Sequence, residues 1–235
     1  MKALLLSAGL GTRLRPVTNT IPKCLVPINA KPLLQYWLEN LTKVGINEFL
    51  INTSYLHKQV EEFVSKSEFK DKITLIYEDE LLNTGGTVLA NKEFFNNEPF
   101  MLIHADNLSF CDFNSFIQAH KNRPKQCDIT MMLFQSDNPR NCGIVELDEN
   151  NIVEKFYEKI SNPPSNLANG AVYICEPSVI SFMETLNKKD IDFSIDVLPN
   201  FMGKINTYLN NTYHRDIGNL ESYGMAQIEM FEFSK

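Results

Sequence analysis

The stretch LLLSAGLGTRLRPVTNTIPKCLVPI, residues 4–28, joins a short apolar run to a long loop rich in glycine, proline and threonine. The apolar run predicts a buried parallel strand over residues 2–7. The loop glycines allow tight backbone geometry and a close approach of N–H groups to an anion, and Arg13 and Lys23 add positive charge. Loops of about 20 residues or more without regular structure are usually functional. The stretch therefore predicts an anion-binding loop that follows a buried strand.

Two well-known phosphate loops do not fit this stretch. A Rossmann fingerprint needs a third glycine where Leu14 stands and an acidic residue near position 29, and both are missing. A Walker A loop needs Gly-Lys at a fixed distance after its first glycine, and neither Gly9 nor Gly11 is followed in that way. The loop is therefore of another kind.

Outward from this stretch, apolar runs alternate with helix-like periodicity through the first half of the chain. Strands are expected at 2–7, 48–53, 72–78 and 99–106, and helices at 33–45, 57–66 and 87–95. The alternation predicts an α/β fold with a doubly wound, mostly parallel sheet that carries helices on both faces. In the second half, strands at 128–134, 143–159 and 169–175, the middle one turning at 148–151, predict an antiparallel extension.

Composition narrows the class of protein. The 235 residues carry 29 acidic and 22 basic side chains, a net charge of -7, which argues against nucleic acid as a partner. No apolar run approaches the roughly 20 residues that span a bilayer, so no membrane partner is expected. The five cysteines are scattered and never spaced C-x-x-C, which favours reduced thiols and a cytoplasmic location.

The loop resembles the signature of the sugar-1-phosphate nucleotidyltransferase family, G-x-G-T-R-L-x-P-x-T followed by P-K-x-x-x-P. The matched positions are Gly9, Gly11, Thr12, Arg13, Leu14, Pro16, Thr18, Pro22, Lys23 and Pro27. Four further segments match the same family in order: EDELLNTGGT (78–87), IHADNLS (103–109), NCGIVELDENNIVEKFYEKI with NLANGAVYI (141–174), and YHRDIGN (213–219). The resemblance spans residues 2 to about 220 and implies one nucleotidyltransferase domain, 1–235, without a C-terminal β-helix.

Within that family the front half, about 1–110, binds the nucleotide and the back half, about 111–235, binds the sugar phosphate. The resemblance implies that Arg13, Lys23 and Asp106 are catalytic. It assigns nucleotide binding to Ala8, Gly9, Gly11, Thr12, Glu80, Asn83, Gly85 and Gly86. It assigns sugar-phosphate binding to Asn107, Gly143, Glu158, Lys159, Asn169 and Gly170. Alone, the glycine turn at 83–87 and the Asn169-Gly170 step would be ordinary turns, and Ile160 stands where the family usually has proline.

The resemblance also implies a magnesium cofactor. Asp106 ends a predicted strand, at the edge of the sheet where α/β proteins bind ligands, and oxygen ligands suit magnesium. Read alone, that aspartate would be a helix cap or a turn residue. The pairing of Asp106 with Asp216 as metal ligands comes from the family, since about 110 positions separate them.

The implied reaction joins a nucleoside monophosphate to a sugar 1-phosphate and releases pyrophosphate. The details TGGT, HADN and CGIVE look most like mannose-1-phosphate or manno-heptose-1-phosphate guanylyltransferases, so GTP is the favoured nucleotide and a GDP-sugar for a surface polysaccharide the expected product. The alternatives are a cytidylyl- or uridylyltransferase for another phosphorylated sugar or alcohol, and a nucleotide-sensing subunit without catalysis. The apolar C-terminal segment 221–233 predicts core packing, with a homodimer contact as its alternative use.

Overall fold

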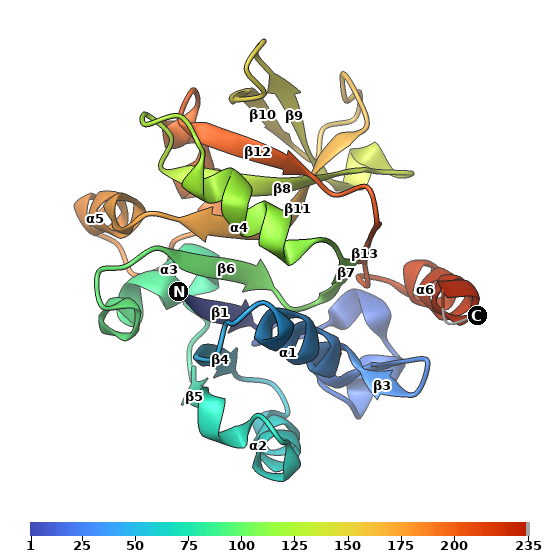
Figure 1. Ribbon diagram of the computed structural model, residues 1–235. Coiled ribbons are helices and arrows are strands. Elements are labelled where there is room, and N and C mark those ends of the chain that lie inside the picture. Colours follow the sequence, from blue (N-terminus) through green and yellow to red (C-terminus); the bar gives the residue numbers. More distant parts are fainter. Residues whose placement is uncertain (234–235) are drawn as a thin grey trace. The chain divides into compact units, whose positions relative to one another are not determined.

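The computed structural model describes residues 1–233, and the chain divides into two compact units (Figure 1). Unit 2 contains residues 2–81, 104–110 and the chain from residue 213. Unit 1 contains Met1 and residues 82–103 and 111–212. Each unit is therefore assembled from segments that lie far apart in the sequence.

Unit 2 is built on three parallel strands. They are β1 (Lys2–Leu6), β4 (Phe49–Thr53) and β5 (Ile73–Tyr77), in the order β1-β4-β5. Helix α1 (Leu33–Lys43) follows β3, and α2 (His57–Lys66) connects β4 to β5. The middle of β1 and all of β4 are buried, as expected for parallel strands that are covered on both faces.

Two short antiparallel pairs complete unit 2. These are β2 (Pro27–Ile28) with β3 (Lys31–Pro32), and β7 (Asn107–Phe110) with β13 (Tyr213–Asp216). Helix α6 (Leu220–Phe233) packs on them through Ala226 and Met230, in one apolar cluster with Leu14 and Ile28. This cluster anchors the phosphate-loop candidate, residues 8–32, to the rest of the unit. Three 3-10 turns, at 12–14, 17–19 and 23–25, give that loop regular structure.

Unit 1 is mostly antiparallel. Strand β11 (Leu167–Cys175) pairs antiparallel with β6 (Phe100–His104), β8 (Ile129–Gln135) and β9 (Gly143–Leu147). Strand β10 (Val153–Glu158) pairs antiparallel with β9, whereas β12 (Ile205–Leu209) runs parallel to β8. Helix α4 (Phe113–Lys121) lies across β8 and β12, and α5 (Pro177–Thr185) follows β11 (Figure 1).

The predicted α/β class, with a parallel core and an antiparallel extension, is confirmed. The strands of residues 1–233 pair in sheets, and none of them forms a β-helix. The predicted helix at 87–95 was misplaced: α3 spans Asn83–Ala90 and a 3-10 turn covers Lys92–Phe95. The helix begins early because both glycines lie in its first turn and bond to a neighbouring loop. Strands β7, β12 and β13 were not predicted, since each is short and carries polar residues.

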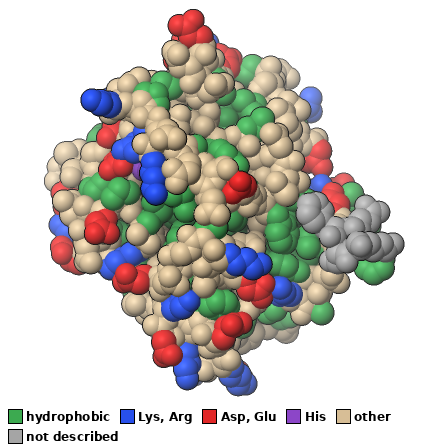
Figure 2. All heavy atoms as spheres, viewed as in Figure 1, with side chains coloured by type: hydrophobic (Ala, Val, Ile, Leu, Met, Phe, Trp, Pro, Cys, Tyr) green, Lys and Arg blue, Asp and Glu red, His purple; other side chains and the backbone are tan. Residues whose placement is uncertain are grey.

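On the face that Figure 2 shows, acidic and basic side chains are interspersed among uncharged ones. Across the part of the chain that the structure describes, every helix is too short or too polar to cross a bilayer.

Candidate active site

A buried polar network lies at the carboxyl ends of the three parallel strands of unit 2. The Ser7 N–H donates to Asn52 Oδ1 (2.7 Å), and Asn52 Nδ2 donates to Glu78 Oε1 (3.1 Å). All three residues are buried, so the hydrogen bonds fix the point at which the chain leaves β1. No role was predicted for these residues from the sequence. Their signal was one polar side chain at or just after the end of each apolar run.

The loop glycines have different physical roles. Gly9 has open space where a Cβ would stand. Gly11 has a left-handed backbone (φ +61°), and a Cβ there would lie 2.9 Å from Thr18 Cγ2. Thr18 Oγ1 in turn donates to the Gly11 carbonyl (2.7 Å). Gly11 is thus required by the loop's own turn, while Gly9 leaves room for another molecule.

Lys23 brings together two carboxylates from distant segments of unit 2. Its Nζ lies 2.6 Å from Asp106 Oδ2 and 3.6 Å from Asp216 Oδ1. The Lys23 side chain is 8% exposed, and the two aspartates are 39% and 50% exposed. Pairing of β7 with β13 places Asp216 opposite Asn107, the residue after Asp106. The structure therefore unites the predicted catalytic lysine and both predicted metal ligands.

Arg13 joins this cluster. A Cβ atom at Gly218 would lie 2.6 Å from Asp216 Oδ2 and 3.1 Å from Arg13 Nη2, so the carboxylate and the guanidinium flank the same glycine. Two cations and two carboxylates thus converge, which we call the charged cluster (Arg13, Lys23, Asp106 and Asp216). The motif at 213–219 predicted no role for Gly218, and the close approach of Asp216 supplies one.

The two carboxylates of the charged cluster differ in acidity. Burial raises the pKa of Asp106, but nearby Lys23 and His104 outweigh burial and lower it to about 2. Burial also raises the pKa of Asp216, and there the weaker hold of Lys23 and repulsion from Asp106 leave it above its usual value. Asp106 is therefore the more strongly ionised member of the pair.

The donor set suits magnesium. Asp106 and Asp216 offer oxygen atoms to a single cationic group, here the ammonium of Lys23. No group of three or more His, Cys, Asp or Glu that could hold a metal occurs within residues 1–233. A magnesium ion at the pair would take its other ligands from phosphate oxygens and water, which is usual for this ion.

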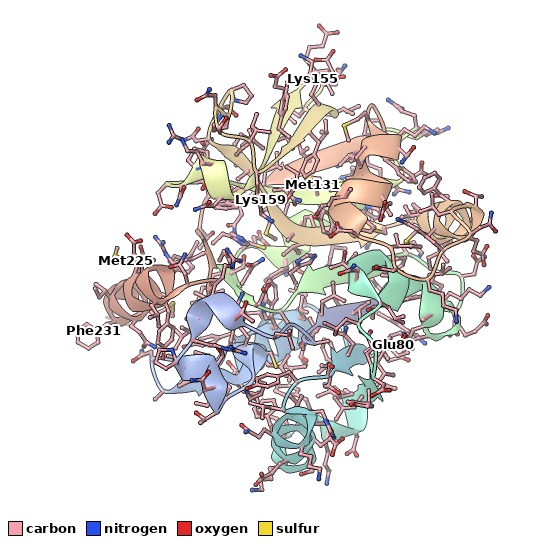
Figure 3. All side chains as sticks on the ribbon, turned by 180° about the vertical axis from the view of Figure 1, so that it is seen from behind. Glu80, Met131, Lys155, Lys159, Met225 and Phe231 are labelled. Carbon is pink, nitrogen blue, oxygen red and sulfur yellow. The ribbon has the colours of Figure 1, made fainter. Side chains whose placement is uncertain are left out.

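The other predicted residues of unit 2 lie in varied surroundings. Ala8 and Asn107 are buried, and the Asn107 carbonyl accepts a hydrogen bond from Trp37 Nε1 (2.8 Å). Thr12 begins a 3-10 turn next to Gly11. Glu80 is exposed in the segment after β5, and Figure 3 marks its position.

In unit 1, other parts of the protein bond to and pack against the two glycines of the turn at 83–87. The N–H groups of Gly85 and Gly86 both donate to the Ile191 carbonyl (2.8 and 3.1 Å). A Cβ at Gly86 would lie 2.2 Å from the Lys189 carbonyl oxygen. Asn83 Nδ2 donates to Asp190 Oδ1. These glycines therefore allow close packing of a loop against the start of α3.

Gly143, Glu158 and Lys159 meet at the ends of β9 and β10. Gly143 stands opposite Glu158, and a Cβ at Gly143 would lie 2.6 Å from the Phe156 ring and 2.9 Å from Glu158 Oε2. The Lys159 N–H donates to the Cys142 carbonyl (3.2 Å), while Lys159 Nζ pairs with Glu158 Oε1 (2.8 Å). The lysine side chain is largely exposed beside its acidic neighbour (Figure 3).

Asn169 and Gly170 lie where β11 changes its register with β8. Asn169 Nδ2 donates to Tyr173 Oη (2.6 Å), and Asn169 Oδ1 accepts from the Ala171 N–H (2.9 Å). The left-handed backbone is at Ala171 (φ 52°), one residue after Gly170. The Asn-Gly pair is thus part of an irregular strand rather than a turn before it.

The family model described as "Nucleotidyl transferase" matches residues 2–232. The chain belongs to this nucleotidyl transferase family.

Relatives within the family extend the comparison. The chain is 30% identical over 226 residues to a mannose-1-phosphate guanylyltransferase of Mycobacterium tuberculosis, covering 94% of this chain and 62% of that protein. It is 34% identical over 190 residues to a probable mannose-1-phosphate guanylyltransferase of Oryza sativa, covering 78% of this chain and 52% of the relative. The chain therefore spans between half and two thirds of the length of these relatives.

Among solved structures, HddC from Yersinia pseudotuberculosis complexed with GMP-PN superimposes with a TM-score of 0.82 at 27% identity. The match covers 97% of this chain and 99% of that one. Together with the match of the family model, this superposition confirms the expected nucleotidyltransferase fold over nearly the whole chain.

Proposed function

We propose that this protein transfers a nucleoside monophosphate from a nucleoside triphosphate to a sugar 1-phosphate and releases pyrophosphate. The observation that carries the proposal is the charged cluster: Lys23 lies within 4 Å of both Asp106 and Asp216, in a chain of the nucleotidyl transferase family. Phosphoryl and nucleotidyl transfers are accelerated mainly by positioning and fixed charge, and the cluster supplies both.

In the proposed reaction, an oxygen of the sugar phosphate attacks the α-phosphorus in line and the bond to the leaving pyrophosphate breaks. Arg13 and Lys23 bind phosphate oxygens and offset the charge that grows on the leaving group. Asp106 and Asp216 would hold magnesium, which screens the repulsion between two polyanionic substrates. No covalent intermediate with the enzyme is required.

We assign the sugar and its phosphate to Glu158 and Lys159. Glu158 offers carboxylate oxygens to sugar hydroxyls, and the exposed ammonium of Lys159 pairs with the phosphate. The short Glu158–Lys159 ion pair holds the lysine until an anion competes for it. The open backbone at Gly9, in unit 2, fits the close approach of a triphosphate.

For the substrates we propose GTP and mannose 1-phosphate, with manno-heptose 1-phosphate as the second acceptor to test. The proposal is supported by the names of the relatives, which are mannose-1-phosphate guanylyltransferases, and by the solved structure that holds GMP-PN. A cytidylyl- or uridylyltransferase and a nucleotide-sensing subunit are the rival functions. We place the reaction in the cytoplasm, because the five cysteines are odd in number and never spaced C-x-x-C, a pattern that favours reduced thiols.

The test is pyrophosphate release in the presence of magnesium. The four common ribonucleoside triphosphates are screened against a panel of phosphorylated sugars and alcohols. Turnover with GTP and mannose 1-phosphate is expected, turnover with another pair would replace these substrates, and tight nucleotide binding without turnover would favour the sensing subunit.

Asp106→Asn tests the metal assignment. We expect turnover to fall by orders of magnitude, because the amide is a poorer ligand for a hard cation. Asp71→Asn is the matched control, since Asp71 is exposed in a 3-10 turn away from the cluster. Full activity of a folded Asp106→Asn variant would contradict the assignment.

A further inference from the structure

A short segment of unit 1, residues 190–194, contacts both the turn at the start of α3 and the irregular part of β11. We call it the bridge. It runs into the π-helical turn Phe193–Val197, which Asp192 caps by accepting hydrogen bonds from the N–H groups of Ser194 (2.8 Å) and Ile195 (3.1 Å). Single π-turns occur often at functional sites, and the contacts of the bridge indicate what this one does.

On one side, the bridge holds the turn at 83–87 and Leu82 just before it. Ile191 is fully buried, and its carbonyl accepts from the N–H groups of Gly85 and Gly86. Its own N–H donates to the Leu82 carbonyl (3.3 Å). The backbone N–H of Phe193 donates to Thr84 Oγ1 (2.8 Å), so the turn satisfies two N–H groups of the bridge.

The fit on this side leaves no spare room. A Cβ at Gly85 would lie 2.6 Å from Ile191 Cγ2, and one at Gly86 would lie 2.2 Å from the carbonyl oxygen of Lys189. Asn83 itself has a left-handed backbone (φ 58°). A non-glycine residue in this region needs support from its surroundings. The hydrogen bond from Asn83 Nδ2 to Asp190 Oδ1 provides it.

On the other side, the bridge holds Tyr173 of β11. The Phe193 ring lies 5.0 Å from the Tyr173 ring, centroid to centroid. Tyr173 is fully buried, so its ring is packed closely against that of Phe193. The Tyr173 hydroxyl accepts from Asn169 Nδ2 (2.6 Å), so the orientation of Asn169 depends on Tyr173 and, through the ring contact, on Phe193.

We propose that the bridge is a positioning element that sets the geometry of the turn at 83–87 and of Asn169 together. The inference rests on the proposed function and on the family resemblance, which assigns the turn to the nucleotide subsite and Asn169 to the sugar-phosphate subsite. Asp190 and Phe193 act through the residues they orient, without touching a substrate. A shift of the bridge therefore changes the binding of both substrates.

The experiment compares Asp190→Ala and Phe193→Leu in the full chain, since leucine keeps the site apolar but removes the ring contact with Tyr173. Asp190→Ala is expected to raise the KM for the nucleoside triphosphate about three- to tenfold, the size of one lost hydrogen bond, with kcat nearly unchanged. Phe193→Leu is expected to raise the KM for the sugar phosphate by a similar factor, because Tyr173 and Asn169 lose the support of the ring. Because the bridge joins the two sites, the effects of the two substitutions should not be independent. The change in kcat/KM of the double variant should differ from the product of the two single-variant changes by about twofold or more.

The controls separate positioning from general loss of stability. Asp128→Ala removes another hydrogen-bonded carboxylate of unit 1, the partner of Ser178 (2.6 Å), and should leave both KM values unchanged. Asp190→Asn keeps an oxygen acceptor for Asn83 and should restore most of the nucleotide KM. Phe193→Leu carries the test if Asp190→Ala does not fold.

Amide hydrogen exchange gives a readout that does not depend on turnover. The N–H groups of residues 85–86 should exchange faster in Asp190→Ala than in Asp128→Ala, because their acceptor, the Ile191 carbonyl, is less firmly held. Unchanged exchange together with unchanged KM values in both variants would overturn the inference. Absence of turnover in the wild type would instead overturn the proposed function, and faster exchange in Asp190→Ala would still support the structural role of the bridge.

Discussion

At Gly218, the absence of a side chain decides where a carboxylate can stand. Asp216 Oδ2 and Arg13 Nη2 both occupy the space that a Cβ at this position would approach, at 2.6 and 3.1 Å. The carboxylate is on a short side chain whose backbone is fixed by the pairing of β13 with β7. The carboxylate cannot move away from an added Cβ without also moving away from Lys23.

Gly218→Ala is therefore expected to lower kcat/KM about 10- to 100-fold, a loss of roughly 1.4 to 2.7 kcal/mol of transition-state stabilisation. Steady-state pyrophosphate release measures it. Gly224→Ala in α6 is the control, because nothing lies within 4 Å of its added Cβ. That control should keep activity and gain about 1 kcal/mol of stability from the better helix propensity of alanine. Equal activity of the two variants would mean that Asp216 has no fixed role.

Ala171 shows how residue-scale strain can sit beside a predicted motif. It adopts a left-handed backbone (φ 52°), which costs an L-residue about 1–2 kcal/mol, although a glycine is available one position earlier. The Asn169 side chain holds this conformation by accepting the Ala171 N–H (2.9 Å).

Ala171→Gly should raise the free energy of unfolding by about 0.5–1 kcal/mol, since relief of strain exceeds the added entropy of the unfolded chain. Urea denaturation measures the change. Ala168→Gly in the same strand is the control and should destabilise, because Ala168 is fully buried and has no positive φ. A loss of stability in Ala171→Gly would show that the strand relaxes without strain at this position.

At the scale of elements, α4 is joined to β8 and to the end of β11 through a buried histidine. The His120 Nδ1 lies 2.9 Å from Thr130 Oγ1 and its Nε2 lies 3.2 Å from a Glu176 oxygen. Burial lowers the pKa of His120 to about 3, and the charge of Arg123, itself bound to Glu176, contributes to the decrease. The ring is therefore neutral in the folded protein at neutral pH.

Because the pKa of His120 is lower in the folded protein than the usual value near 6.5 in the unfolded chain, the unfolded state binds the proton more tightly. Stability from this residue is complete above about pH 6.5 and is lost as the pH falls from there toward about 3. We expect the free energy of unfolding to fall by about 1–2 kcal/mol from this source between pH 7 and pH 5, with a limit of about 1.4 kcal/mol per pH unit. Urea titrations at both pH values measure it, and His120→Gln should show a shallower dependence. The same slope in both proteins would contradict the assignment.

Helix α6 has two different faces. Ala226 and Met230 are buried against the rest of unit 2, whereas Leu220, Met225, Ile228 and Phe231 are exposed, and Figure 3 shows Met225 and Phe231 projecting from the helix. Core packing of the C-terminal segment therefore holds for one face, and the homodimer stays a prediction.

At the scale of the whole molecule, ligand binding should raise the free energy of unfolding. A nucleoside triphosphate with magnesium at about 100 times its Kd adds about 2.7 kcal/mol, which for a chain of this size is a Tm increase of roughly 5–10 °C. Removing magnesium with EDTA should abolish most of the increase while leaving the Tm of the unliganded protein unchanged. An increase that is the same with and without EDTA would show that the nucleotide binds without the proposed metal.

Asp106→Asn should lose the magnesium-dependent part of this shift. Asp71→Asn should keep it, because Asp71 lies in an exposed 3-10 turn of the same unit. Differential scanning fluorimetry measures all of these conditions on one plate.

The sequence alone determined the α/β class and most strand positions. It could do so because the spacing of apolar residues within a segment indicates which of its side chains are buried, and that pattern needs no information from distant parts of the chain. The loop signature also singled out Arg13 and Lys23, two of the four members of the charged cluster. The position of α3 was missed, because its first turn contains two glycines that are poor helix formers and depend on the Ile191 carbonyl. That contact joins residues about a hundred positions apart, and no local pattern reports it.

Only the tertiary structure decided which residues meet. The return of the chain at residues 104–110 and again at 213 brings Asp106 and Asp216 to Lys23, and pairing of β7 with β13 fixes their separation. It also showed that protein atoms lie close to Gly85, Gly86 and Gly143, at positions where the family resemblance implies contacts with substrates. A glycine in a sequence indicates that other atoms can approach the backbone closely at that position. Which atoms come close depends on strand register and loop packing, and these are set by burial and hydrogen bonding between distant segments.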